Sequence, residues 1–386
     1  MLLVGGVLPS RAEAFPVFAR TFSVPCSSCH SSITRRSEFG DVFRKNGFQW
    51  PGGLELHDSI DLQGRSPLAG ALPKNSPIAL VAQASASHTF ENVPEEDQLP
   101  VVSPGGPSFN LLFAAPIGDN VTMFGTWPGS GGPNEMYAAF SRLFQTPALN
   151  LKVGLFEQTT TVFRTNENLL APYRLSTAAH NGHSVGQARM GVEASGVLGR
   201  RTFWAAGTVK NSDFGAHWDS YYHLEYKFGG IDLHGREPEV DLDAEPTLWE
   251  DSAVTVSHWG YLGKVSDPGG EDTAKIRRLG LDLKLQLTRT SLWSGYQLGL
   301  DQELVSNQQV TNVTTFVELS YAVRSWFRPM YLIQFVDSTT MERESISHDV
   351  GVIGLVTENL RLRASFRYTQ DSVENEVANF QMLFAF

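Results

Sequence analysis

Two cysteines and a histidine form the motif with the clearest chemistry in this chain. Cys26 and Cys29 are the only cysteines among 386 residues, and His30 follows the second one directly. This C-x-x-C-H spacing is the pattern of a c-type haem attachment site. Both thiols would bond covalently to the porphyrin, and His30 would bind the iron as an axial ligand. We therefore expect one covalent haem c on Cys26, Cys29 and His30.

Other interpretations of the motif are a disulfide, half of a zinc site, or chance. A zinc site needs two further nitrogen or sulfur ligands at comparable spacing, and none follows closely. A thioredoxin-type redox motif belongs in a strand–helix–strand context, which this region lacks. Haem attachment is the interpretation that the surrounding sequence favours.

The residues around the motif predict a small unit over 15–60. Within it, Ser37 is a suitable helix N-cap, Phe39 and Phe43 share one helix face, and Gly47 would end the helix. A unit this small has a poor core by itself. Further aromatic side chains could cover a porphyrin and add apolar area, namely Phe18, Phe22, Phe48 and Trp50.

The second axial ligand of the iron is not evident from the motif. After the first residue no methionine precedes Met123, which excludes a methionine from the small unit. His57 is a candidate for this iron ligand, and His88 is a weaker one. A position left open or filled from the rest of the chain is the remaining alternative.

The start of the chain predicts export. Residues 1–14 contain a short apolar run and the small-x-small pattern Ala12-Glu13-Ala14, as in a signal peptide, although no basic residue precedes the run. The alternative is the start of a cytosolic protein. No later stretch is long and apolar enough for a transmembrane helix. A net charge of −11 argues against a nucleic-acid partner.

From about residue 77 to 386 the sequence alternates between apolar and polar residues. Leu279, Leu281 and Leu283, for example, alternate with Gly280 and Asp282. About sixteen such segments follow a linker at 61–76, an even number, and many have the length of about 9–11 residues that crosses a bilayer when tilted. We therefore expect an all-β fold, an antiparallel transmembrane barrel of about sixteen strands in the bacterial outer membrane.

Loops of this barrel should alternate between short periplasmic turns and longer outer loops. The long, acidic connection 229–249 is an exception, because by strand count it belongs to the periplasmic side. With the apolar residues toward lipid, the charged residues of the strands should face the lumen, where they could hold a plug and the haem propionates. They are Glu225, Lys227, Asp282, Lys284, Arg361, Arg363 and Arg367.

The N-terminal motifs carry a resemblance to a known family. Phe18-Ala19-Arg20, the C-x-x-C-H motif and Phe39-Gly40-x-x-Phe43-Arg44-Lys45-x-Gly47-Phe48 resemble the outer-membrane monohaem cytochrome–porin fusions of iron-oxidising bacteria. The resemblance covers about 35 residues. It implies a small cytochrome unit that plugs a barrel, takes electrons from extracellular Fe(II) and passes them to periplasmic cytochromes. Arg35 and Arg36 replace a more usual proline-containing stretch.

Two functions follow as expectations. The first is electron transfer across the outer membrane through a single haem, with an external donor such as Fe(II) and a periplasmic c-type cytochrome as acceptor. The second is a porin or diffusion channel with a structural or gating haem unit. A haem peroxidase is a weaker third possibility, because no distal acid–base group is evident.

Overall fold

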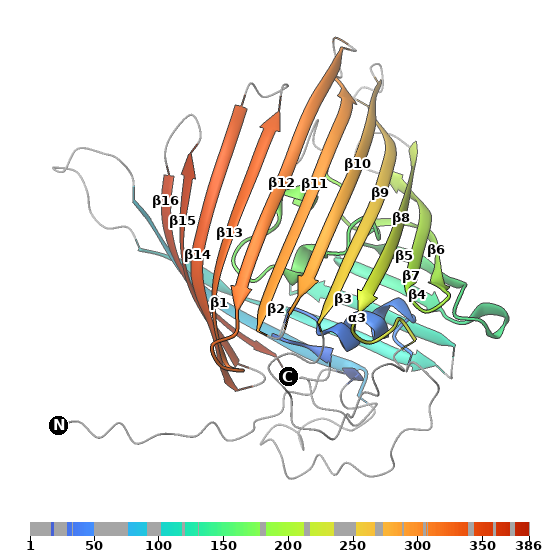
Figure 1. The fold of residues 1–386 in the computed structure, drawn as a ribbon, viewed down its shortest axis with the longest axis horizontal. Helices are drawn as coiled ribbons and strands as arrows, with labels where there is room; N and C mark the ends of the chain where they lie inside the picture. Colours follow the sequence, from blue (N-terminus) through green and yellow to red (C-terminus); the bar gives the residue numbers. More distant parts are fainter. Residues whose placement is uncertain are drawn as a thin grey trace.

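The computed structural model shows a closed antiparallel β-barrel in which sixteen described strands pair in sequence order and β1 closes on β16 (Figure 1). The structure describes residues 17–18, 29–32, 34–49, 76–90, 102–117, 120–129, 131–177, 183–211, 217–234, 252–266, 273–287, 289–303, 306, 308–338, 343–357, 360–370 and 375–385. The predicted fold class and the number of strands are confirmed. The predicted signal peptide 1–14, most of the linker 61–76, Cys26 and His57 lie outside the described residues.

The strands are β1 Ile78–Phe90, β2 Val102–Ile117, β3 Val121–Pro128, β4 Glu135–Phe140, β5 Asn150–Phe156, β6 Arg189–Leu198, β7 Thr202–Asn211, β8 His217–Gly229, β9 Ala253–Ser266, β10 Thr273–Gln286, β11 Thr290–Gln302, β12 Gln309–Tyr321, β13 Phe327–Ser338, β14 Arg343–Thr357, β15 Leu360–Gln370 and β16 Asn375–Ala385. Several are longer than predicted; β9 has 14 residues and β14 has 15. A strand of that length extends past the hydrocarbon layer, so its polar ends carry no apolar signal in the sequence.

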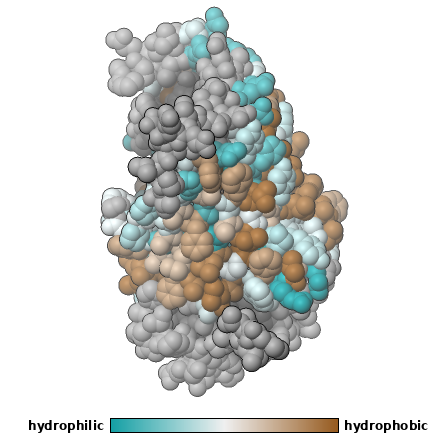
Figure 2. Space-filling view, turned by 90° about the vertical axis from the view of Figure 1, so that its left-hand side faces the viewer, coloured by the Kyte–Doolittle hydropathy of each residue, from teal (hydrophilic) through white to brown (hydrophobic). Residues whose placement is uncertain are grey.

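The alternation along each strand separates an outer from an inner face. On β8, Trp218, Leu224 and Phe228 are exposed, whereas Glu225 and Lys227 between them are buried. Apolar side chains gather across the middle of the outer surface in Figure 2. A charged side chain facing lipid near the bilayer centre costs about 2–4 kcal/mol, which explains the inward direction of the charges. The predicted inward position is confirmed for the charged strand residues, since Asp282, Lys284 and Arg361 are also buried.

The helix α3, Glu38–Lys45, forms where the sequence predicts it. The Ser37 side chain caps it by accepting a hydrogen bond from the Gly40 N–H at 3.1 Å. Acidic residues lie in its first turn and basic residues in its last turn, which suits the helix dipole. Gly47, with φ +72°, follows the helix in a left-handed conformation that glycine adopts without strain.

Buried ion pairs join α3 to the inner face of the barrel wall. The Glu38 carboxylate lies 2.6 Å from the ammonium groups of both Lys227 on β8 and Lys284 on β10. At the other end of the helix, Lys45 pairs with Glu225. Three of the charged residues that the sequence predicted to face the lumen therefore have partners on α3, namely Glu225, Lys227 and Lys284.

The connection after β8, which disturbed the loop pattern, also packs against α3. Ile231 and Leu233 are buried in one cluster with Val42 and Phe43. The Leu233 carbonyl accepts a hydrogen bond from the Asn46 side chain at 2.9 Å. The beginning of this connection is therefore part of the support of the helix, and residues 235–251 lie outside the described part of the chain.

Residues 157–177, here called the inner loop, follow β5 and turn into the barrel. They contain the 3-10 helix η3, Thr165–Glu167, and the short helix α4, Arg174–Thr177. The Phe163 ring stacks on Trp293 of β11 and the Tyr173 ring on Phe316 of β12. The sequence predicts a long outer loop here, over 157–186, and does not indicate its inward course. None of the helices in the described ranges is long and apolar enough to span a bilayer.

Candidate haem-binding cavity

A cavity of about 800 Å³ lies between the N-terminal segment, the barrel wall and the inner loop. Cys29 and His30 both line it. The aromatic rings of Phe18, Phe43 and Phe48 form part of its apolar wall, and Phe48 stacks on Phe124 of β3. This volume is within the range of about 300–1,000 Å³ that is typical of small-molecule and cofactor sites.

Residues 34–40 hold Cys29 and His30 in place by backbone contacts. The Ser37 N–H donates to the Cys29 carbonyl oxygen at 2.9 Å, and a β-bridge pairs His30 with Arg36. Gly40 packs so tightly on the Cys29 carbonyl that a Cβ there would overlap it. The helix capped by Ser37 therefore also fixes the second half of the C-x-x-C-H motif.

The His30 ring is in the chemical form that binds metals. Burial and the nearby Arg36 lower the pKa of His30 to about 4, so its imidazole is neutral at physiological pH. The backbone of Ser32 and Arg35 lies beside the buried ring. A neutral imidazole on a cavity wall suits an axial ligand of haem iron.

Two arginines of β15 line the same cavity. Arg361 donates to the Thr34 hydroxyl at 2.7 Å, and Arg363 donates to the Leu170 carbonyl of the inner loop at 2.7 Å. The Nε atoms of both guanidinium groups have no partner within the described residues. Guanidinium groups bind carboxylates in a planar, two-point geometry, which suits haem propionates.

The third predicted arginine of this strand lies elsewhere. Arg367 pairs with Asp349 at 2.7 Å and does not line the cavity. Lys227, Lys284 and Glu225 bind α3, as described above, and the Asp282 carboxylate accepts from the Val162 N–H of the inner loop at 3.0 Å. The charged residues of the lumen thus contact different parts of the chain: the neighbouring strand β14, the helix α3 or the inner loop. The sequence does not distinguish these contacts.

Two glutamates also line the cavity, and each is paired with an arginine. Glu135 and Glu157 line it, and both form ion pairs with Arg164 of the inner loop, the second at 3.1 Å. The structure shows no cluster of three or more His, Cys, Asp or Glu suited to a metal ion in the part of the chain that it describes. No second histidine and no methionine is among the described lining residues.

The residues present fit a covalent haem. The cavity combines a motif thiol, a neutral imidazole, aromatic walls and guanidinium groups. The candidate His57 is outside the described residues. The His88 ring packs on the Phe90 ring, with 4.3 Å between their centroids, and His88 does not line the cavity. Sequence reasoning missed the inner loop as a wall of this site; its only sequence signal is its length.

Comparisons with known proteins address the barrel. No protein-family model and no curated protein sequence matches the chain. Among solved structures, an anion-selective porin from Comamonas acidovorans aligns with a TM-score of 0.60 and 9% identity over 80% of this chain and 98% of that porin. Salmonella typhi OmpF aligns with a TM-score of 0.57 and 11% identity, covering 80% and 97%.

A further likeness is to OmpT of Vibrio cholerae, with a TM-score of 0.55 and 9% identity over 80% of this chain and 97% of that one. At such low identity, these similarities show the fold alone. A closed sixteen-stranded barrel with an apolar outer face is the architecture of bacterial outer-membrane porins. The predicted location in the outer membrane is confirmed.

Proposed function

We propose that this protein carries one c-type haem inside an outer-membrane barrel and transfers electrons across the membrane, with the N-terminal unit as a plug. The observation that supports this most is the position of Cys29 and His30 on the wall of a cavity enclosed by barrel strands. The apolar band of such a barrel is about 25 Å tall. Electron transfer across it needs a redox group within the lumen rather than at the surface.

The residues of the chain have separate roles in this proposal. When bound, the haem supplies reversible one-electron chemistry at its iron. Cys26 and Cys29 would hold it covalently, and the neutral His30 ring would bind its iron. Arg361 and Arg363 would bind its propionates, while Phe18, Phe43 and Phe48 would cover its apolar surface.

The electron partners are taken from the resemblance of residues 18–48 to the monohaem cytochrome–porin fusions. That resemblance suggests extracellular Fe(II) as donor and a periplasmic c-type cytochrome as acceptor. A stopped-flow spectrum of the purified protein mixed with Fe(II) would test the donor.

The first experiment tests the haem itself. The purified protein should retain haem through denaturing electrophoresis and show the absorption of a reduced c-type haem after dithionite. A variant with Cys26→Ala and Cys29→Ala should lose both signals. A haem-free preparation of the parent, expressed with a c-type maturation system, would disprove the proposal.

A diffusion channel is the second candidate, and the porin fold favours it. The two functions differ in liposomes that enclose both a redox acceptor and a small solute. An electron conduit transfers electrons from a donor outside the liposome to the enclosed acceptor, while the solute is retained. A channel releases the solute, with no haem-dependent reduction, and that result would favour the second function.

A further inference from the structure

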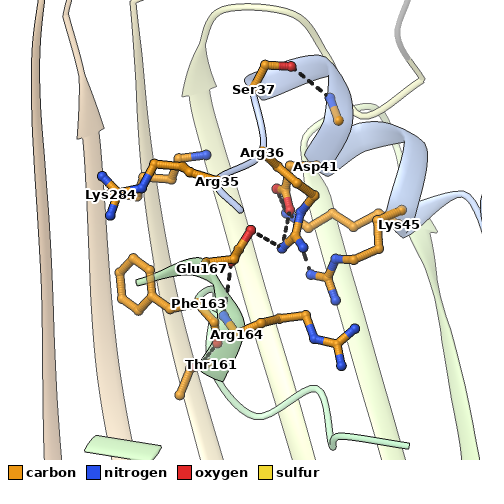
Figure 3. A network of polar contacts seen from close by, with 12 residues as sticks. Arg35, Arg36, Ser37, Asp41, Lys45, Thr161, Phe163, Arg164, Glu167 and Lys284 are labelled. Carbon is orange, nitrogen blue, oxygen red and sulfur yellow. Dashed lines mark hydrogen bonds and ion pairs between the residues drawn. The ribbon is translucent and has the colours of Figure 1, made fainter. Parts of the chain in front are cut away.

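One ion pair links the inner loop to the segment that follows the C-x-x-C-H motif. The Arg36 guanidinium lies 2.7 Å from the Glu167 carboxylate (Figure 3). Their side chains are only 14% and 3% exposed, so water screens the pair weakly. Arg36 lines the candidate haem cavity, and its backbone pairs with that of His30.

The neighbouring arginine is directed elsewhere. Arg35 binds Glu318 and the Tyr173 hydroxyl and lies over the Trp293 ring, 3.8 Å from its centroid. Arg35 lies in the turn closed by its N–H bond to the Ser32 carbonyl at 3.0 Å, and Arg36 follows in the bridge with His30. Arg35 therefore attaches the segment to the wall, whereas Arg36 faces the cavity.

The charges of this pair reach the proposed iron ligand. The backbone bridge holds Arg36 beside His30, and the ion pair places the Glu167 carboxylate on the Arg36 guanidinium. The two charges thus act on the ring with opposite signs. In the intact pair they partly cancel.

We infer that Arg36 and Glu167 are tuning residues, which together set the reduction potential of the haem that the proposed function requires. The oxidised iron carries one more positive charge than the reduced iron. A positive charge beside it therefore disfavours oxidation and raises the potential, and a negative charge lowers it. Glu167 of the inner loop at 2.7 Å and Asp41 of α3 at 3.6 Å compensate Arg36, so the loop supplies the nearer of two negative charges that offset its positive charge.

The test breaks the same ion pair from either end. Glu167→Gln should raise the midpoint potential and Arg36→Gln should lower it, measured by spectroelectrochemical titration of the c-type haem band in the purified barrel. The Glu167→Gln side chain keeps an oxygen that can accept the Arg164 N–H, now 3.0 Å from the carboxylate. The double variant should return toward the parent value.

The matched controls are Arg367→Gln and Asp349→Asn. These two residues form an ion pair at 2.7 Å on the barrel wall, and neither residue lines the cavity. Both control potentials should stay near that of the parent. Arg36→Lys retains the charge, so its midpoint potential should also stay near that of the parent. This variant can be measured if Arg36→Gln fails to fold.

The outcomes separate this inference from the proposed function. Opposite shifts support a charge effect, because mere loosening of the segment would move both potentials in one direction. Shifts of the same sign, or none, overturn the tuning role while the haem band of the parent remains. A parent without a haem band instead disproves the proposed function.

Discussion

Gly40 of α3 lies directly against the carbonyl group of Cys29, with no space for a Cβ between the helix and the motif. The contact brings the first turn of the helix onto the backbone of the proposed haem attachment site. The same carbonyl oxygen accepts the Ser37 N–H. Helix capping and motif geometry therefore depend on one another.

Gly40→Ala is expected to displace the helix from Cys29. Overpacking of this kind costs typically about 1–3 kcal/mol, here at a rigid backbone atom. Haem content per protein and the melting temperature of the haem absorbance should both fall. Gly132→Ala is the control, because a Cβ there meets no atom within 4 Å. Unchanged haem content in Gly40→Ala would contradict the proposed packing.

Glu38→Gln should weaken the attachment of α3 to the wall. The carboxylate lies between Lys227 and Lys284, and its neutralisation leaves two buried ammonium groups without their counter-charge. Breaking a buried ion pair typically costs about 3–5 kcal/mol. Protease cleavage within residues 29–49 of the folded barrel should become much faster. The exposed Glu376→Gln should behave like the parent.

Because of the Glu38 carboxylate, the attachment of α3 to the wall should weaken at low pH. Burial opposes its charge, but Lys284 and Lys227 outweigh burial and lower the pKa of Glu38 from 4.5 to about 2. A carboxylate whose pKa is lower in the folded state stabilises that state at any pH above its pKa in the unfolded chain. This stabilisation disappears as the pH falls toward the pKa in the folded state. Protection of residues 29–49 should therefore decrease between pH 4.5 and 2. In Glu38→Gln this part of the decrease should be absent.

The three arginines of β15 provide an internal comparison. Arg361→Gln and Arg363→Gln remove positive charge from the cavity and should lower the haem potential. Arg361→Gln should also loosen the N-terminal segment, because it removes the bond to the Thr34 hydroxyl. Arg367→Gln should change neither, because its partner is Asp349 and it does not line the cavity. Equal effects of all three substitutions would argue against propionate binding by Arg361 and Arg363.

The sequence predicted the barrel well because lipid and lumen impose opposite requirements on neighbouring residues. Leu224 and Glu225 could not exchange faces without placing a charge in hydrocarbon, so the pattern specifies the strand and which of its faces turns toward the lumen. The helix α3 was predictable for a local reason, since Ser37 and Gly47 mark its ends.

The candidate site was predictable only in part. The motif identified Cys29 and His30, but the contacts of Glu38 with Lys227 and Lys284 join residues about 190–250 positions apart and depend on the register of the wall. Likewise, nothing local indicates that Glu167 reaches Arg36. Such pairs follow from tertiary arrangement, and a single sequence contains no periodic signal for them.

The pairing of β1 with β16 has a consequence for truncation. Their ladder runs from Val81 opposite Ala385 to Phe90 opposite Glu376 and leaves no free edge in the cylinder. Loss of the 11 residues of β16 would expose two rows of backbone donors and acceptors, on β1 and β15, to hydrocarbon that cannot bind them. The C-terminal strand is therefore among the least dispensable parts of the wall, although it lies at the end of the chain.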